Sequence, residues 1–469
     1  MPDMSPGARQ LVDQVERDVE HGLLPLRVFH DAELHAHELD RIFMRAWVYV
    51  GHESEIPARG DYAQRYVAGD AFIFVRGEDG VVRVLFDSCR HRGALVCRAD
   101  RGNASHFRCP YHGWSYKNTG EMVGAPFFRA AYGGELQREQ WGLHQAARVE
   151  SVHGFVFASL DPAAPSLDDY LGDMRWYFDV IWGMATEGWD VVGDPQRFII
   201  PANWKAAADN FSGDDYHTFY LHRSTVETGV IEAPSGDPAE YQNGYHVQVG
   251  NGHGLSCFLA PEGLDDFGFL GYPPELWSRF SADAIGEEAF AAARRLSGCV
   301  GTVFPNFSFL SFPFAWSREG EAVASMTVRV WQPLGPGEIE VWNWVLSPKG
   351  VPAEFREQTY RATMATFSAS GMLEQDDAEP WIAMSRSARS NYARKLDMKL
   401  NYQMGLTGAG ASKRTDDFPG PGVAYFPVFE EGVHRGFHRR WAQFMRSDEY
   451  PAPMSAEQQD GQAEVHARG

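Results

Sequence analysis

The sequence predicts an α+β protein with a small antiparallel β domain and a larger domain in which an antiparallel sheet is flanked by helices. Short strand segments broken by turn residues between Asp61 and Asp161 indicate the β domain, and mixed helical and strand patterns follow them. The 469 residues are enough for two or three domains. We expect the β domain at 41–165, the larger domain at 166–449 with an N-terminal helical part at 1–40, and a flexible tail at 450–469.

The strands expected in the β domain are short and separated by recognisable turns. Asp79-Gly80 and Asn118-Thr119-Gly120 are turn sequences, because glycine and asparagine accept the backbone conformations that tight turns require. A helix is expected before them at Asp31–Trp47, with Asp31 as its N-cap. The expected strands are Ala71–Val75, Val81–Phe86, Trp114–Tyr116 and Gly154–Leu160.

The larger domain should combine helices with a sheet that contains a hairpin. Strands Ala322–Gln332 and Glu338–Leu346 flank the turn sequence 333–337, and another strand is expected at Val303–Trp316. Helical periodicity predicts helices at Ser166–Trp182, Asn203–Tyr220 and Glu354–Phe367.

Composition excludes several classes of protein. The net charge of −21 argues against binding to a phosphate backbone, so no nucleic-acid partner is expected. The N-terminus lacks the apolar core of a secretion signal, and the most apolar stretch, 303–316, is too short to span a membrane. Five cysteines are too few for a disulfide framework. We therefore expect a cytoplasmic protein.

Two thiols and two imidazoles stand in the predicted β domain at metal-ligand spacing. Cys89-Arg90-His91 is followed, after 17 residues, by Cys109-Pro110-Tyr111-His112. A fold that places the two short loops opposite each other would present four ligands to one point. This set also suits a structural zinc ion, and chance cysteines with core histidines are the third explanation.

A second candidate metal site lies in the larger domain. His217 and His222 are five residues apart, so on an ideal helix they would diverge by about 140° and could not bind one ion unless the helix ended or bulged between them. Asn210, Asp214 and His217 would share one helix face. Two histidines and a downstream carboxylate form the facial triad typical of oxygen-activating ferrous sites, whereas an ordinary polar helix face is the alternative for the histidine segment alone.

Both segments resemble the large subunits of Rieske-type ring-hydroxylating oxygenases over most of the chain. The shared motifs are Cys-x-His with Cys-Pro-Tyr-His-Gly-Trp, Asp-x-Tyr-His-x-x-x-x-His, and the late Glu-x-Asp-Asp. The resemblance implies a Rieske [2Fe-2S] cluster with Cys89 and Cys109 on one iron and His91 and His112 on the other. It implies a mononuclear Fe(II) held by His217, His222 and Asp377, with Asp376 the less favoured neighbour. Asp214 would link His112 to His217 across adjacent subunits.

The resemblance also implies a reaction and partners. A terminal oxygenase of this kind would use O₂ and electrons from NADH, delivered by a reductase and usually a ferredoxin, to cis-dihydroxylate an aromatic ring. A homotrimer is implied, in an α3β3 assembly with a small β subunit. The implied substrate-binding residues are Asn210, Phe211, Thr218, Phe367 and Leu373, and the absence of Arg or Lys among them favours a neutral aromatic hydrocarbon.

Alternatives to ring dihydroxylation remain at this stage. A Rieske monooxygenase or demethylase would use the same metal ligands. A simple Rieske electron carrier would leave about three hundred residues without a role, and a zinc-stabilised binding protein would need no redox chemistry. The segment from Arg83 to Lys117 contains seven basic residues and two acidic ones. Such an excess of positive charge is typical either of a surface that docks an acidic electron donor or of solvated loops.

Overall fold

The computed structural model describes residues 3–228, 244–260, 268–315 and 320–461. The chain divides into two compact units, a smaller one formed by Phe43–Leu167 and a larger one formed by Met1–Ile42 with Asp168–Gly469. The N-terminal segment therefore belongs to the larger unit, and the division falls two residues later at each end than the predicted 41–165. The predicted α+β fold class is confirmed.

The smaller unit consists of three antiparallel sheets. The strand orders are β10-β11-β2, β5-β4-β3-β6 and β7-β8-β9. Helix α3, Phe128–Tyr132, follows β9. The strands are β2 Val48–His52, β3 Asp61–Val67, β4 Asp70–Arg76, β5 Val82–Phe86, β6 Arg101–Asn103, β7 His106–Arg108, β8 Ser115–Lys117, β9 Met122–Gly124, β10 Arg148–Val152 and β11 Phe155–Ser159.

A single hydrophobic cluster joins two of these sheets to the loops that carry the predicted cysteine ligands. Ile73 and Leu85 come from β4 and β5, Tyr116 comes from β8, and Cys89 and Cys109 belong to the same buried cluster. The loops are therefore anchored in a close-packed core, which limits their movement.

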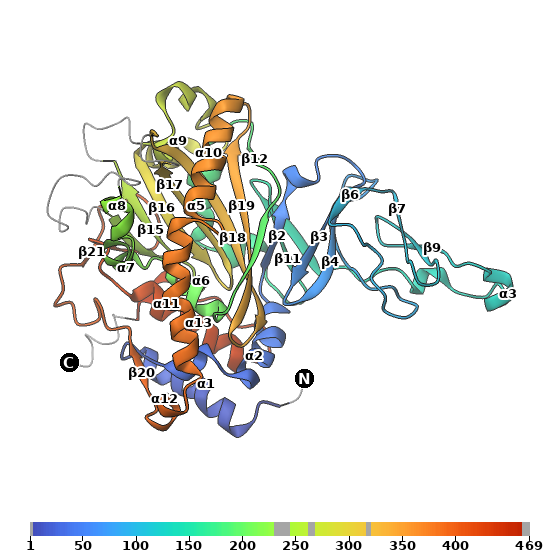
Figure 1. Ribbon diagram of the computed structural model, residues 1–469, viewed down its shortest axis with the longest axis horizontal. Helices are drawn as coiled ribbons and strands as arrows, with labels where there is room; N and C mark the ends of the chain where they lie inside the picture. Colours follow the sequence, from blue (N-terminus) through green and yellow to red (C-terminus); the bar gives the residue numbers. More distant parts are fainter. Residues whose placement is uncertain (1–2, 229–243, 261–267, 316–319, 462–469) are drawn as a thin grey trace. The chain divides into compact units, whose positions relative to one another are not determined.

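The larger unit contains, among the residues described, a ten-stranded antiparallel sheet (Figure 1). Its order is β12-β19-β18-β17-β16-β15-β14-β22-β21, and β13 also pairs with β19. The predicted hairpin is confirmed as β18 with β19. The strands are β12 Trp189–Val191, β13 Gln196–Ile200, β14 Gly244–Gln248, β15 Gly254–Leu259, β16 Leu296–Val303, β17 Phe307–Phe314, β18 Val323–Gly335, β19 Glu338–Pro348, β21 Lys413–Thr415 and β22 Val423–Phe426; β1 Leu23–Pro25 pairs separately with β20 Lys399–Asn401.

Helices pack around this sheet, and α10 and α11 run across one of its faces in Figure 1. Helix α10 contacts β17, β18 and β19, while α13 contacts β14 and β15. The helices are α1 Pro6–Val19, α2 Ala32–Glu38, α4 Leu167–Leu171, α5 Met174–Phe178, α6 Trp204–Asn210, α7 Asp215–Leu221, α8 Arg223–Glu227, α9 Gly286–Arg295, α10 Ala353–Thr366, α11 Met372–Ala388, α12 Asn391–Lys395, α13 Gly432–Arg446 and α14 Ala456–Asp460.

Three predicted elements are interrupted. The helix expected at Ser166–Trp182 is divided into α4, α5 and a π-helical turn at Asp179–Gly183. The helix expected at Asn203–Tyr220 is two helices, because α6 ends at Asn210 and α7 begins at Asp215. Gly213 lies in this break at φ +134°, where a Cβ would lie 3.0 Å from the Ser256 hydroxyl. The strand expected at Val303–Trp316 contains the end of β16, a turn at 304–306 and β17; Trp316 lies outside the described residues.

The expected flexible tail at 450–469 is wrong for its first part. Helix α14 begins after Ser455, whose side chain accepts a hydrogen bond from Gln458 N in a capping box. Gln459 and Asp460 are buried, and Tyr425 donates a hydrogen bond to Asp460. Polar composition alone misled the prediction, because these polar side chains are paired inside the larger unit. Residues 462–469 lie outside the described part.

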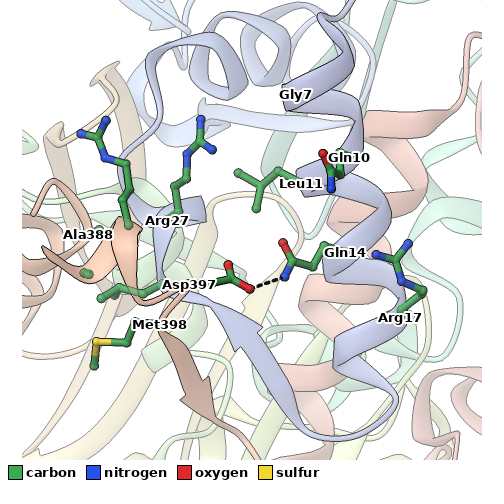
Figure 2. Close-up of a pocket in the computed structure, with 12 residues that line it drawn as sticks. Gly7, Gln10, Leu11, Gln14, Arg17, Arg27, Ala388, Asp397 and Met398 are labelled. Atoms are coloured by element: carbon green, nitrogen blue, oxygen red, sulfur yellow. Dashed lines mark hydrogen bonds between the residues drawn. The ribbon is translucent and has the colours of Figure 1, made fainter. Parts of the chain in front are cut away.

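A cavity of about 370 Å³ lies beside α1 (Figure 2). Arg17, Arg27 and Arg394 contribute to its lining, and Gln14 donates a hydrogen bond of 3.0 Å to Asp397 across it. None of its lining residues belongs to the predicted metal sites. Within the described residues, no helix is both long and apolar enough to cross a membrane.

Candidate metal centres

The two cysteine loops of the smaller unit have the same backbone conformation. Cys89 N donates a hydrogen bond to Ala94 O and Gly93 N donates back to Cys89 O. In the second loop Cys109 N donates to Trp114 O and Gly113 N donates to Cys109 O. Both glycines have φ near +75°, which the turn requires and which other residues rarely adopt. Each loop therefore presents one cysteine at its base and one histidine near its tip.

In this double-loop arrangement the two predicted histidine ligands lie side by side and the two cysteines share one buried cluster. Cys89 and Cys109 are buried, and the rings of His91 and His112 have centroids 4.5 Å apart. The ring of His91 stacks on Trp114 with an interplanar angle of 9°. His91 Nδ1 is buried and makes no hydrogen bond within the described protein. Two thiols and two imidazoles, one with an unpartnered buried nitrogen, fit the donor set of a Rieske cluster.

Two residues that the sequence prediction missed hold these loops. The Asp87 carboxylate accepts hydrogen bonds from Val96 N at 2.7 Å and Cys97 N at 2.9 Å, so it fastens the end of the first loop. The Tyr116 hydroxyl lies 3.3 Å from Cys89 Sγ and accepts a hydrogen bond from Arg90 N. An acid before a Cys-x-His motif carries no signal of this function in sequence, because its partners are two backbone groups and the side chain of Gln64 on another strand.

The three predicted ligands of the second metal site come from the α7 segment and from α11. His217 lies in the first turn of α7, and His222 is the C-cap residue of α7, with φ −88° and ψ 11°. Asp377 Oδ1, from α11, lies 3.3 Å from His217 Nε2 and 3.2 Å from His222 Nε2. One ligand atom from each of the three residues falls within 4.8 Å of the others. Because α7 ends at Leu221, between the two histidines, both imidazoles can point toward one ion despite their five-residue spacing.

Asp377 and Asp376 occupy different positions around this triad. Asp377 is 2% exposed and faces the inner nitrogens of both imidazoles. Asp376 Oδ2 instead lies 3.3 Å from His222 Nδ1, the outer nitrogen. A carboxylate on the outer nitrogen orients an imidazole ligand and raises its basicity. The geometry therefore favours Asp377 as the third ligand and gives Asp376 a supporting position.

The outer nitrogen of His217 faces Asn210 and Asp214. Asn210 Nδ2 lies 3.3 Å from His217 Nδ1 and donates to Asp214 Oδ2 at 3.3 Å, and Asp214 Oδ2 lies 3.5 Å from the same histidine nitrogen. Asp214 also caps α7 by accepting from His217 N. The three side chains meet as predicted, although a break between helices brings them together rather than a continuous helix face.

Electrostatics around the triad favour a positive charge. Burial raises the pKa of Asp377, but the two adjacent imidazoles outweigh burial and lower this pKa to about 2. Burial lowers the pKa of His217, but Asp214 and Asp377 outweigh it and raise this pKa well above its usual value. Two imidazoles and a carboxylate in such a field fit a ferrous ion.

The predicted substrate-binding residues fall into two groups. Phe211, Phe367 and Leu373 are buried, and the rings of Phe211 and Phe367 meet edge to face at 6.3 Å. Asn210 is part of the metal site, and the Thr218 hydroxyl donates to Asp215 O at 2.7 Å. Phe211 and Phe367 therefore pack against each other and Leu373 is buried on α11, while the other two residues make polar contacts in the α6–α7 segment.

A buried cation that the sequence prediction missed lies against these rings. The Arg329 guanidinium is 4.6 Å from the ring centroid of Phe211 and 4.9 Å from that of Phe367. It pairs with Glu374 at 2.6 Å, and the two side chains are 0% and 2% exposed. Because Glu374 lies one helical turn before Asp377, this ion pair fastens α11 close to the metal site.

Comparisons with known proteins agree with this geometry. Residues 46–139 match the Rieske [2Fe-2S] domain, and residues 167–447 match the ring hydroxylating alpha subunit (catalytic domain). The chain is 40% identical to the N,N-dimethyl phenylurea N-demethylase subunit alpha of Sphingobium sp. (strain YBL2), covering 93% of this chain and 95% of the relative. It is 37% identical to the biphenyl dioxygenase subunit alpha of Metapseudomonas furukawaii, covering 93% of each.

A solved structure matches over nearly the whole chain. Naphthalene 1,2-dioxygenase from Rhodococcus sp., bound to indole, has a TM-score of 0.90 and 41% identity, covering 96% of this chain and 100% of that one. The fold and the two donor sets thus define the large subunit of a Rieske non-haem iron oxygenase. The chain belongs to the ring-hydroxylating oxygenase alpha-subunit family, whose Rieske domain carries a [2Fe-2S] cluster and whose catalytic domain carries mononuclear iron.

Proposed function

We propose that this protein is the terminal oxygenase of a multicomponent system that inserts O₂ into a neutral mono- or polycyclic aromatic hydrocarbon as a cis-dihydrodiol. The observation that carries the proposal is the convergence of His217, His222 and Asp377 within 4.8 Å, in a chain that also holds the Rieske donor set. Biphenyl dioxygenase and naphthalene dioxygenase relatives support the aromatic substrate class. Phe211, Phe367 and Leu373 would supply the apolar surface for such a substrate.

We assign Cys89, His91, Cys109 and His112 to the cluster and His217, His222 and Asp377 to the ferrous ion. When bound, the cluster would supply electrons and the ferrous ion would supply oxygen activation. Other residues of the chain orient these ligands. The Tyr116 hydroxyl hydrogen-bonds to Cys89 Sγ, and Asn210, Asp214 and Asp376 contact the outer nitrogens of His217 and His222. We assign Asp214 as the connector toward His112 of a neighbouring subunit.

The electron donor would be NADH, acting through a reductase and a ferredoxin. In the balanced reaction, one arene, one O₂, two electrons and two protons give one cis-dihydrodiol. Arg92, Arg98, Arg101 and Arg108, in and around the two cysteine loops, are exposed and suit an acidic donor. Reversing the charge of Arg98 and Arg101 should weaken the salt dependence of cluster reduction by the donor.

Oxidative N-demethylation is the second candidate. The 40% identity to a phenylurea N-demethylase subunit over 93% of this chain favours it. In that reaction an N-methyl group, O₂, two electrons and two protons yield the demethylated amine, formaldehyde and water.

One reconstitution separates the two reactions. Purified protein, NADH and a donor pair would be supplied with ¹⁸O₂ and either biphenyl, naphthalene or N,N-dimethyl phenylurea. A diol carrying both labelled atoms supports ring dihydroxylation, whereas formaldehyde in proportion to NADH supports demethylation. The Asp377→Ala variant is the control for uncoupled NADH oxidation. Zinc in place of iron, with no acid-labile sulfide, would refute both.

The working assembly would be a homotrimer, completed by small β subunits as α3β3. Exposed aromatic residues flank the predicted ligands in each unit: Tyr111 is 60% exposed beside His112, and Tyr216 is 63% exposed beside His217. Mixing a Cys89→Ser subunit with an Asp377→Ala subunit tests this arrangement. Each variant lacks one of the two metal sites, so a mixed oligomer is active only if electrons pass from one subunit to its neighbour. The absence of any recovered activity would contradict the trimeric arrangement.

A further inference from the structure

A buried polar cluster lies behind the break between α6 and α7. It consists of Asp209 at the end of α6, Ser212 in the break, Tyr402 after β20, and His434 and His438 on α13; we name it the Asp209 cluster. Each of these residues except Tyr402 is at most 6% exposed. The proposed metal ligands and substrate-binding residues do not include any of them.

His434 contacts the end of α6 and one residue of the break. Its Nδ1 lies 2.9 Å from Asp209 Oδ1 and 3.2 Å from the hydroxyl of Ser212. Ser212 in turn donates to the backbone oxygen of Asp209 at 2.6 Å. Tyr402 donates to the second carboxylate oxygen of Asp209 at 2.9 Å, so both oxygens are occupied. The last turn of α6 is thereby tied to α13, 225 residues further along the chain.

The break leads directly to the proposed connector carboxylate. Asn210, the neighbour of Asp209, is the residue that contacts both Asp214 Oδ2 and His217 Nδ1 at 3.3 Å. Only Phe211, Ser212 and Gly213 separate Asn210 from Asp214. A shift in the end of α6 would therefore move the Asn210 amide and the Asp214 carboxylate relative to His217.

The cluster is also an ion pair in a low-dielectric environment. Burial raises the pKa of Asp209, but His434 and His438 outweigh it and hold this pKa below its usual value. Burial lowers the pKa of His434, but Asp209, Asp214 and Glu431 outweigh it and raise this pKa to about 9. A buried pair of this kind contributes little net stability, but separating its two groups leaves an uncompensated buried charge, which penalises arrangements that part them.

We propose that His434 is a positioning residue: through Asp209 and Ser212 it holds the α6–α7 break in the arrangement in which Asn210 and Asp214 contact His217. The proposal rests on the connector role assigned to Asp214. Its consequence is that His434 controls how fast electrons leave the reduced cluster, without being a ligand of either metal.

The test compares two substitutions at one position. In His434→Asn the side-chain amide nitrogen replaces Nδ1 as a donor to Asp209, whereas His434→Leu removes the donor. His438→Leu is the matched control, because His438 approaches Asp209 only at 3.6 Å and has no contact with Ser212 among the described interactions. The holoenzyme is reduced, mixed with O₂ and substrate, and the reoxidation of the cluster is followed by its visible absorbance.

We expect His434→Leu to slow reoxidation at least tenfold and to change the EPR spectrum of the nitric oxide adduct of the ferrous site. Iron content and cluster potential should stay at wild-type values, and His434→Asn should recover the rate to within about threefold. If His434→Leu does not fold, Asp209→Leu, which removes the acceptor oxygens that His434 contacts, should slow reoxidation in its place.

Failure of this inference can be told apart from failure of the connector assignment. If Asp214→Asn slows reoxidation but His434→Leu matches wild type or His438→Leu, the positioning role of His434 is refuted. If Asp214→Asn itself reoxidises at the wild-type rate, the connector assignment fails and the role of His434 fails with it. Equal slowing by His434→Leu and His434→Asn would also overturn the proposal, because the donor at Nδ1 would then be irrelevant.

Discussion

Replacing Arg329 with methionine tests whether the buried Arg329–Glu374 pair fastens α11. Both side chains are at most 2% exposed, so Arg329→Met leaves a carboxylate without a partner in the core. Breaking a buried ion pair on one side costs about 3–5 kcal/mol. With a urea m value of about 3 kcal/mol/M, the unfolding midpoint of the larger unit should fall by about 1–1.7 M. Glu374→Met should cause a loss of similar size.

The double variant distinguishes this explanation from simple loss of packing. In Arg329→Met/Glu374→Met neither charge remains, and methionine can still pack against Phe211 and Phe367. We therefore expect the double variant to be more stable than either single variant, as a double-mutant cycle of the urea midpoints would show. Additive losses would refute the argument, because they would mean that each side chain contributes only its own packing.

The pH dependence of Arg329→Met provides a second check. Burial raises the pKa of Glu374 above 4.5, and Arg329 opposes this increase in the wild type. Without Arg329, the folded protein binds a proton at Glu374 more tightly than the unfolded chain does, so its stability falls as pH rises above 4.5. The deficit of Arg329→Met relative to wild type should therefore be smaller at pH 5.5 than at pH 8. A deficit that did not change with pH would contradict this account.

Three further predictions follow from the sites. Asp377→Asn should lose mononuclear iron in metal analysis. Asp376→Asn should keep it with affinity reduced about 10- to 100-fold, because Asp376 contacts the outer and not the inner nitrogen of His222. Equal iron loss in both variants would remove the distinction between the two acids. Tyr116→Phe removes the hydrogen bond to Cys89 Sγ, which is worth roughly 1 kcal/mol. The reduction potential of the cluster, measured by redox titration, should therefore fall by about 40 mV. An unchanged or higher potential would count against a hydrogen bond from Tyr116 to Cys89. His253 accepts from Phe304 N, and burial lowers its pKa to about 3. The unfolded chain therefore binds one more proton than the folded protein between pH 6.5 and 3. As the pH falls through this range, the unfolding free energy of wild type, measured in urea, should decrease by about 1.4 kcal/mol per pH unit more than that of His253→Gln. Parallel pH curves for the two proteins would show that His253 is not the titrating group.

Local sequence was sufficient for the parts of the protein that depend on short-range geometry. The Cys-x-His and Cys-x-x-His segments form tight loops because Gly93 and Gly113 permit the required turns close to each ligand. Hydrophobic alternation likewise predicted the β18–β19 hairpin, whose strands are neighbours in the chain. Turn residues and period-two patterns carry this information within ten or so residues.

Contacts between distant segments decided the rest. The spacing of the histidines required a helix end without locating it, and only the packing of α11 against α7 placed Asp377 inward and Asp376 outward. His434 meets Asp209 across 225 residues, and Arg329 meets Glu374 across 45. Such pairs leave no periodic trace in a sequence, because a buried charge is stabilised by whichever partner the fold brings to it. The sequence therefore indicated the candidate ligands, whereas the residues that contact and orient them were found only in the tertiary structure.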